Sequence, residues 1–444
     1  MSLIARSFTS RASRAINAHP HELKPALAGF MLMLCLFAGY FMLRPVRDAM
    51  GIQAGVEHLQ WLFTATFIGM LVAVPLFAWL NSVVPRTRFI DWVYAVFASH
   101  LLLFALTFGG LADNLWLART FYVWISVYNL FVVSVTWSLM GDVFDSQQAR
   151  RLFAFIAAGA SVGGLLGPLL SVWLGAGLGP AGLALASALL LGLALWLKHC
   201  LMAWRERGGA GRPGAPAGEH PRRPVAGNPF SGVLRVVRSR YLSMVCVFVV
   251  LLATTSTFLY FEQARLIAAR FPTRAEQIQV FGLIDFAVQA GALTAQLFIT
   301  SRIAQRFGVT SLLMAVPLVV AMGFVALALA PSFALLAGVM IARRIGEYAF
   351  IRPGREMLFA PLDAESKYKA KNFIDTVVYR GGDAFAGWLK SALDALQHGA
   401  VWVPVIGALA AGTWALSGWY LGRGDTSGAG RPAEGAKGRV SADG

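Results

Sequence analysis

Long apolar runs dominate this chain, and their number and placement restrict its fold more than any motif does. Each run holds roughly 20 residues, enough for a helix to cross about 30 Å of hydrocarbon. The first set covers 26–43, 59–81, 89–109, 115–140, 154–175 and 179–200, and the second covers 241–261, 279–300, 309–330, 332–352, 372–393 and 400–421. We therefore expect an all-α membrane protein with twelve transmembrane helices in two six-helix halves.

An internal repeat supports two equivalent halves. Residues 144–168 resemble residues 362–387, and a shift of 218 positions places Phe155 on Phe373 and Gly163-Gly164 on Gly381-Gly382. Each copy lies between the fourth and fifth runs of its half. Membrane proteins built from repeats commonly rock one half against the other around a central site. The repeat therefore favours a transporter.

Composition and charge agree with a membrane location. The chain is 57% hydrophobic and 14% charged, whereas soluble domains are roughly 25% charged. Most of its 38 Lys and Arg residues fall on one side if both termini are cytoplasmic, as the positive-inside rule requires. The net charge of +16 is thus interpreted as a topology signal and not as a nucleic-acid-binding patch. A bacterial inner membrane is expected. The acid-free first 21 residues, which resemble a transit peptide, leave an organelle inner membrane as the alternative.

The same pattern predicts the domain organisation. Residues 205–229 are rich in Gly, Pro and Arg without apolar periodicity, which is typical of a flexible linker. We expect a basic cytoplasmic N-terminus (1–24), an N-terminal half (25–200), a flexible cytoplasmic linker (201–240), a C-terminal half (241–421) and a disordered tail (422–444).

Motifs for catalysis or metal binding are missing from the sequence. Cys35, Cys200 and Cys246 are isolated, and no histidine pair has ligand spacing. We predict neither an enzyme nor a cofactor. The expected partners are the lipid bilayer and a small anionic solute; the oligomeric state stays open, and a monomer is compatible with the sequence.

The first informative charged cluster is LRPVRDAMG, residues 43–51, at the predicted outer end of the first helix. Arg44 and Asp48 are four residues apart and are expected to pair on one face. Arg47 is then left free to bind an anion. The alternative is an interfacial anchor that extends its charges to water.

A second group of charges falls near the middle of the tenth and eleventh runs, where an ionisable residue costs about 2.5–3.5 kcal/mol to insert. Arg343 and Glu347 are one turn apart and should pair, whereas Arg344 has no such partner on its helix. The eleventh run adds Asp375, Arg380 and Asp383. These charges either contact the substrate or form a salt-bridge network that holds the bundle or a gate. Asp285 and Glu262 are candidate coupling carboxylates.

Charged residues at the inner helix ends are candidates for gating. Asp142 and Asp145 close the fourth helix, and Arg150 and Arg151 open the fifth. Opposite charges at these positions can pair across the cytoplasmic mouth and separate when the halves move. Lys369 and Asp375 are candidates for the same role in the second half. Small residues at 159, 163 and 167 predict a close helix-packing face.

Three segments together resemble the nucleotide transporter family, the ATP:ADP antiporters of plastids and intracellular bacteria. They are LRPVRDAMG, GDVFDSQQARRLFAFIAAGASVGG and RPGREMLFAPLDAESKYKAKNFID. The resemblance runs from about residue 25 to 395 and implies a major-facilitator-like fold with nucleotide exchange across a membrane. It places Arg47 at a transport-essential cation of the family. It also matches the family's second-half block to Arg355, Glu356, Asp363, Lys367, Lys369, Lys371 and Asp375.

The chain departs from that family at three charged positions. A family glutamate falls on Ile125, another falls near Tyr260, and a family lysine falls near Asp383, with Arg380 the nearest cation. The predicted fold still supports a transporter, whereas the identity of its substrate stays open. Alternatives to nucleotide exchange are a transporter of another organic anion, a proton-linked exporter, and a membrane scaffold or sensor that transports nothing.

Overall fold

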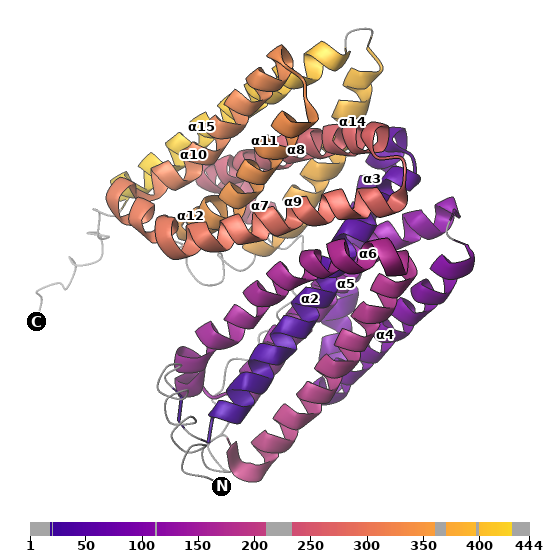
Figure 1. Cartoon of the computed structure of the whole chain (residues 1–444). Coiled ribbons are helices and arrows are strands. Elements are labelled where there is room, and N and C mark those ends of the chain that lie inside the picture. Colours follow the sequence, from indigo (N-terminus) through magenta and orange to yellow (C-terminus); the bar gives the residue numbers. More distant parts are fainter. Residues whose placement is uncertain are drawn as a thin grey trace, which may run out of the picture.

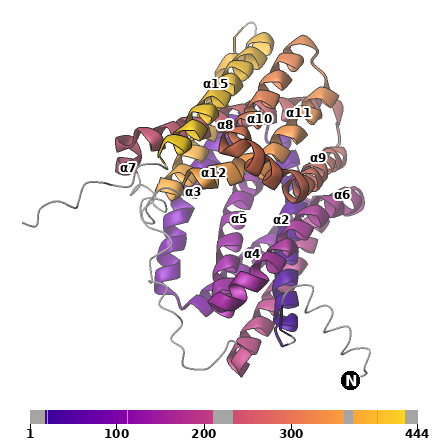
Figure 2. The same cartoon turned by 90° about the vertical axis from the view of Figure 1, so that its left-hand side faces the viewer.

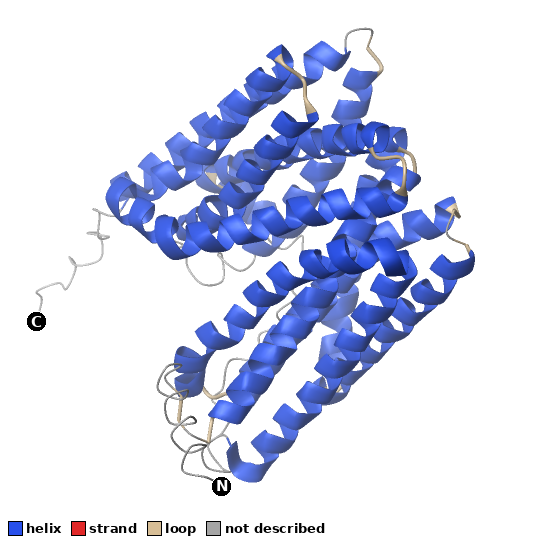
Figure 3. Cartoon of the chain, viewed as in Figure 1, coloured by secondary structure: helices blue, strands red, loops and turns tan. Residues whose placement is uncertain are grey.

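The computed structural model describes residues 18–19, 21–111, 113–209, 233–359, 370–396 and 399–428. Every regular element in these ranges is helical, and Figure 3 shows helices joined by short loops. Most of the predicted linker and the end of the predicted tail lie outside the described residues.

The first group of helices contains α2 (Leu23–Gln53), η1 (Val56–His58), α3 (Leu59–Val83), α4 (Arg86–Gly110), α5 (Leu115–Val143), α6 (Ser146–Trp204) and η2 (Arg205–Gly209). The second begins with α7 (Val233–Arg238), α8 (Arg240–Arg270), α9 (Arg274–Ala295), η4 (Gln296–Thr300), α10 (Ser301–Leu329), α11 (Phe333–Gly346) and η5 (Glu347–Ile351). It continues with α12 (Arg352–Leu358), η6 (Ile374–Val378), α14 (Tyr379–Asp394) and α15 (Gly399–Gly428).

Seven helical segments of the described chain are long and apolar enough to cross a membrane. Two of them, Ser146–Arg207 and Arg274–Leu329, hold 62 and 56 residues. Each is interrupted by a glycine with positive φ, Gly179 (60°) in the first and Gly308 (72°) in the second. This left-handed conformation is accessible to glycine and strained for residues with a Cβ atom. Both breaks fall where the sequence predicts one apolar run to end and the next to begin.

Figure 1 shows the helices in two groups, with α2 to α6 in indigo to magenta and α8 to α15 in rose to yellow. Each group has its own large apolar core. The predicted small-residue face is confirmed in the first group. A Cβ atom added at Gly159, Gly163 or Gly167 would collide with backbone atoms of α2. The absence of side chains at these positions lets α6 approach α2 closely.

The two groups meet at one end of the molecule. Leu59 and Leu62 of the first group share an apolar cluster with Phe261 and Ala264 of the second. Nearby, the Trp388 indole donates a hydrogen bond of 3.1 Å to the Thr64 hydroxyl. The groups diverge toward the opposite side, where α2 begins and α15 ends (Figure 1), and Figure 2 shows the same separation from a second direction.

Several helices extend beyond the bounds expected from the sequence. The first helix does not end at residue 43, because α2 continues through Pro45 to Gln53. The charged cluster at 43–51 therefore lies within a helix, where Asp48 is buried. The predicted linker (201–240) contains the end of α6, η2, α7 and the first residue of α8, and α15 extends to Gly428, beyond the predicted start of the tail.

Candidate functional site

A cavity of about 630 Å³ lies between the two groups of helices, with walls from α2, α3, α5, α8, α11, η5, α12, η6 and α14. Its cationic lining residues are Arg44, Arg47, Arg343, Arg344, Arg352, Arg355, Lys371 and Arg380. Its carboxylates are Asp48, Glu347, Glu356, Asp375 and Asp383. These eight cations face the five carboxylates of the lining and Asp285, which bonds Arg344 and lies 3.7 Å from Arg44, so the described residues carry an excess of two positive charges.

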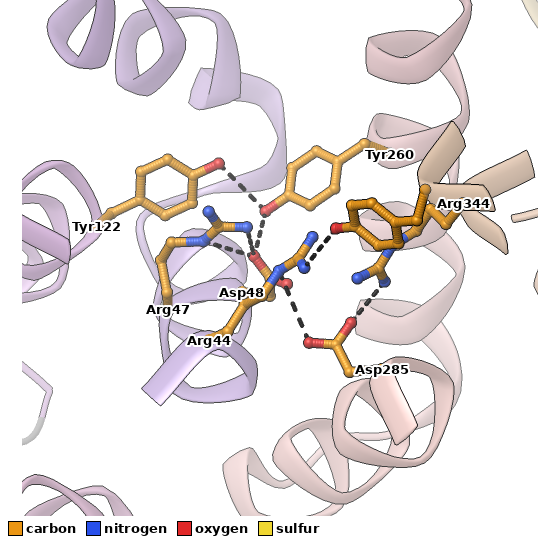
Figure 4. A network of polar contacts seen from close by, with 8 residues as sticks. Arg44, Arg47, Asp48, Tyr122, Tyr260, Asp285 and Arg344 are labelled. Carbon is orange, nitrogen blue, oxygen red and sulfur yellow. Dashed lines mark hydrogen bonds and ion pairs between the residues drawn. The ribbon is translucent and has the colours of Figure 1, made fainter. Parts of the chain in front are cut away.

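The α2 cluster is arranged differently from the sequence-based expectation. The Arg47 guanidinium donates two hydrogen bonds to Oδ1 of Asp48, at 2.9 and 2.5 Å, so Arg47 is paired and not free. Successive residues diverge by about 100° around a helix, but a long arginine side chain can fold back to its neighbour. Asp48 also accepts a hydrogen bond from Tyr260 of α8 at 3.0 Å (Figure 4), so this pair is tied to the second group.

Asp285 of α9 links the two groups of helices. Its Oδ1 accepts a hydrogen bond from Arg344 of α11, and its Oδ2 lies 3.7 Å from Nε of Arg44 on α2 (Figure 4). Asp285 is only 2% exposed. As the sequence predicts, Arg344 has no partner on its own helix; it pairs with Asp285 on another helix. Likewise, Arg44 contacts Asp285 and the Tyr348 hydroxyl.

The second-half charges include one pair that the sequence predicted correctly. Arg343 donates to Glu347 at 3.0 Å, one turn along the chain. Arg380 is held more loosely, with its nearest Asp383 oxygen 3.6 Å away, and its side chain is 34% exposed. Asp383 accepts a hydrogen bond from Thr257 of α8 at 3.3 Å. Arg380 is thus oriented by Asp383 while keeping most of its donors available.

Four residues of the second-half block line the cavity as two ion pairs. Arg355 lies 2.9 Å from Asp375, and Lys371 lies 2.5 Å from Glu356. They join the short helix α12 to η6 and to the residues just before it. The other residues singled out in this block, Asp363, Lys367 and Lys369, lie outside the described residues.

Among the residues predicted to gate the inner mouth, Arg151 has a partner that the sequence did not reveal. Arg151 donates two hydrogen bonds to Glu22, at 3.1 and 2.9 Å, and Gln148 donates another to the same carboxylate. This contact joins α6 to the start of α2 and so lies within the first group. Asp145 caps α6 by accepting hydrogen bonds from its first turn. Asp142 and Arg150 lie in the adjoining ends of α5 and α6.

Burial opposes ionisation of Glu22, but hydrogen bonds from the His19 amide, Arg151 and Gln148 outweigh it and lower the pKa of this carboxyl below its usual value. A lowered pKa means that the stabilising contribution is present above the unfolded-state pKa. It is lost as the pH falls through the folded-state pKa. The Glu22–Arg151 pair is therefore intact at neutral pH.

Glu262 belongs to a separate ionic cluster. It lies 2.7 Å from Arg265 and 2.8 Å from Lys390, which also contacts Asp394 at 2.6 Å. Lys390 is 2% exposed, so this cluster ties α8 to α14.

Sequence reasoning also missed the cavity tyrosines, which carry no charge pattern to reveal them. They are Tyr40, Tyr122, Tyr260, Tyr348 and Tyr379.

Comparisons with known proteins agree with this architecture. The family model of the Major Facilitator Superfamily matches residues 26–342. ADP,ATP carrier protein 1 of Chlamydia muridarum is 24% identical over 448 residues, covering 84% of this chain and 83% of the carrier. A bacterial homologue of the iron transporter ferroportin, solved in an inward-facing state, has a TM-score of 0.67 at 12% identity and covers 90% of this chain and 99% of its own.

The nucleoside transporter NupG has a similar fold, with a TM-score of 0.61 at 12% identity, covering 90% of this chain and 98% of its own. At these identities the solved structures report the fold alone. The family model, by contrast, spans well over half of the chain. With its helical segments and its cavity between two groups of helices, this chain belongs to the Major Facilitator Superfamily.

Proposed function

We propose that the chain crosses a bacterial inner membrane twelve times in two six-helix halves, with both termini and the central linker in the cytoplasm. The breaks at Gly179 and Gly308 and the two separate cores support this arrangement. The distribution of Lys and Arg supports the orientation. Labelling an Ala215→Cys variant in intact cells checks it, because a linker cysteine that reacts with an impermeant outside reagent contradicts the proposal.

We further propose that this protein is a secondary transporter that exchanges phosphate-bearing anions, nucleotides of the ATP and ADP type, by alternating access. The observation that carries the proposal is the cavity, in which both groups of helices present arginines with an excess of two positive charges once Asp285 is counted. Uncompensated charge away from water is costly. An anion that enters this space supplies the missing negative charge.

The available donors suit a phosphate group in particular. Arg352, Arg380 and Lys371 are the most exposed of the cavity cations, at 59, 34 and 32%. Guanidinium groups bind phosphate oxygens through paired, charge-assisted hydrogen bonds. The ADP,ATP carrier names of the relatives fit this chemistry. The absence of a glutamate at Ile125 does not argue against phosphate binding, because other residues supply the positive charge of the cavity.

The arrangement of contacts corresponds to an inward-open state in the proposed topology. Apolar packing and the Trp388–Thr64 hydrogen bond join the groups at the end away from the start of α2. The Glu22–Arg151 contact lies at the other end and stays within the first group. Closing the inner mouth would bring the charged ends of the two groups together, as alternating access requires.

A binding test can be made without transport. Purified protein should melt at a higher temperature with ATP or ADP than with adenosine, because only ligands that bind the folded state stabilise it and only the nucleotides carry phosphate. At a hundredfold excess over Kd, the stabilisation is about 2.7 kcal/mol. Equal shifts with adenosine, or none with ATP at millimolar concentration, would argue against the proposal.

The inner-end contact makes a kinetic prediction. Arg151→Ala and Glu22→Gln should each slow exchange several-fold at saturating substrate while leaving affinity within about twofold, because neither residue lines the cavity. If the contact acts as one unit, the double variant should be no slower than either single variant. A loss of affinity with unchanged turnover would place Arg151 in the binding site instead.

A second candidate function is transport of an organic anion coupled to protons. The observation that favours it is Asp285, a carboxylate 2% exposed between arginines of both groups. A carboxylate in this position could exchange a proton as its arginines move away. Uptake driven by a pH gradient, without any counter-substrate, would select this candidate over exchange.

A further inference from the structure

A second cavity, of about 410 Å³, adjoins the charged one. Val74 of α3, Leu130 of α5 and Thr376 of η6 line both spaces. One ligand can therefore place a charged group among the arginines and extend another part past these three side chains. The volume falls within the roughly 300–1,000 Å³ that is usual for small-molecule sites.

The walls of the second cavity differ in chemistry from those of the first. None of its described lining residues is charged, and its largest side chains are Phe77, Phe89 and Trp137. The Phe77 and Phe89 rings have centroids 5.5 Å apart and are tilted by 59°. Such walls favour a flat aromatic group, which gains from contact with ring faces and edges.

Polar side chains from three segments of the chain also line the second cavity. Asn81 comes from α3, Ser134 and Ser138 from α5, and Asn372 from the segment before η6. The two serines are one helical turn apart and so face the same way. Within the part of the chain that the structure describes, Asn81 and both serines have side chains without a hydrogen-bond partner. The Asn372 carbonyl accepts from Thr376 at 3.4 Å, which leaves its amide hydrogens available.

We propose that this second cavity holds the planar heterocycle of the substrate while its phosphates lie in the charged cavity. The inference rests on the proposed function and adds the position and recognition of the base. Ring nitrogens and exocyclic groups of a heterocycle can pair with the amides and hydroxyls that line the space. An alkyl chain would bury those groups without partners, which disfavours it.

The placement of the two cavities also orients the ligand. Thr376 lies on their shared boundary, and Arg380 follows it by one helical turn. Asp375, which precedes Thr376, pairs with Arg355. A heterocycle beyond Thr376 therefore directs its phosphates first toward Arg380 and then toward the other arginines of the charged cavity.

The test separates the ring from the phosphates by comparing ATP with inorganic tripolyphosphate, which carries phosphates and no ring. Binding of each to purified protein is measured through the melting temperature in the unchanged chain and in Ser138→Leu and Asn81→Leu. Ser99→Leu serves as the control, because Ser99 is exposed on α4 and bonds only its own helix. We expect each cavity variant to weaken ATP binding about tenfold and to leave tripolyphosphate binding within about twofold. Ser99→Leu should change neither.

Other outcomes overturn the inference in distinguishable ways. Unchanged ATP binding in both cavity variants would show that the second cavity does not hold the ring. The same conclusion would follow if the unchanged chain bound tripolyphosphate as tightly as ATP. Equal weakening of both ligands would show an effect through the fold. Decyl phosphate binding more tightly after Ser138→Leu would assign the space to an alkyl chain. If neither phosphate compound binds, the proposed function fails together with the inference.

Discussion

Replacing Arg380 with glutamine should reduce nucleotide uptake roughly 30- to 150-fold. The change removes a guanidinium that is 34% exposed and lies 3.6 Å from Asp383, so it keeps most of its donors free for a phosphate. Losing one charged partner of a desolvated, hydrogen-bonded pair costs about 2–3 kcal/mol or more, which corresponds to this range. Initial rates of labelled ATP uptake into proteoliposomes measure the effect.

Two variants control this prediction. Arg265→Gln makes the same chemical change at a residue that is 58% exposed and pairs with Glu262 at 2.7 Å, outside the cavity lining. It should leave uptake within about twofold. Arg380→Lys keeps the charge but loses the planar pair of donors, so it should restore only part of the activity. Full uptake by Arg380→Gln would show that this cation is structural.

Replacing Asp285 with asparagine should strengthen anion binding and slow transport at the same time. Asparagine preserves the shape of the side chain and removes the charge that faces Arg44 and Arg344. Breaking a buried ion pair by removing one partner costs about 3–5 kcal/mol. A bound anion can recover part of this cost, so we expect affinity to rise about tenfold and turnover to fall about a hundredfold.

Glu347→Gln is the matched control for Asp285→Asn. It also removes one negative charge that faces cavity arginines, but its partners Arg343 and Arg352 both belong to the second group of helices. If net charge alone governs binding, both variants should behave alike. If the link between the two groups matters, only Asp285→Asn should slow turnover strongly. Equilibrium binding and exchange at saturating nucleotide separate the two quantities.

Much of the fold could be predicted from the sequence, because apolar runs of spanning length have few alternatives in a bilayer. The glycine face at 159, 163 and 167 was also visible, since small residues four apart form one helix face. Helix ends were harder to predict. Pro45 does not end α2, because neighbouring helices can compensate for a missing backbone hydrogen bond inside a membrane protein.

The charge pairings of the site could be predicted only within a helix. Arg343 and Glu347 are one turn apart, and the structure confirms their contact. The partner of Arg344 is Asp285, 59 positions away, and no helical spacing indicates such a contact. The arginine expected to be free, Arg47, bonds its neighbour Asp48. Side-chain length and packing between helices decide these cases.

Counter-exchange in proteoliposomes tests the central claim most directly. Purified protein is reconstituted into vesicles that are either preloaded with unlabelled ADP or left empty, and labelled ATP is added outside without a pH gradient. We predict rapid uptake into the preloaded vesicles and little into the empty ones, with Arg380→Gln abolishing most of the difference. Equal uptake with and without internal ADP, or no uptake by protein that still melts cooperatively, would contradict nucleotide exchange.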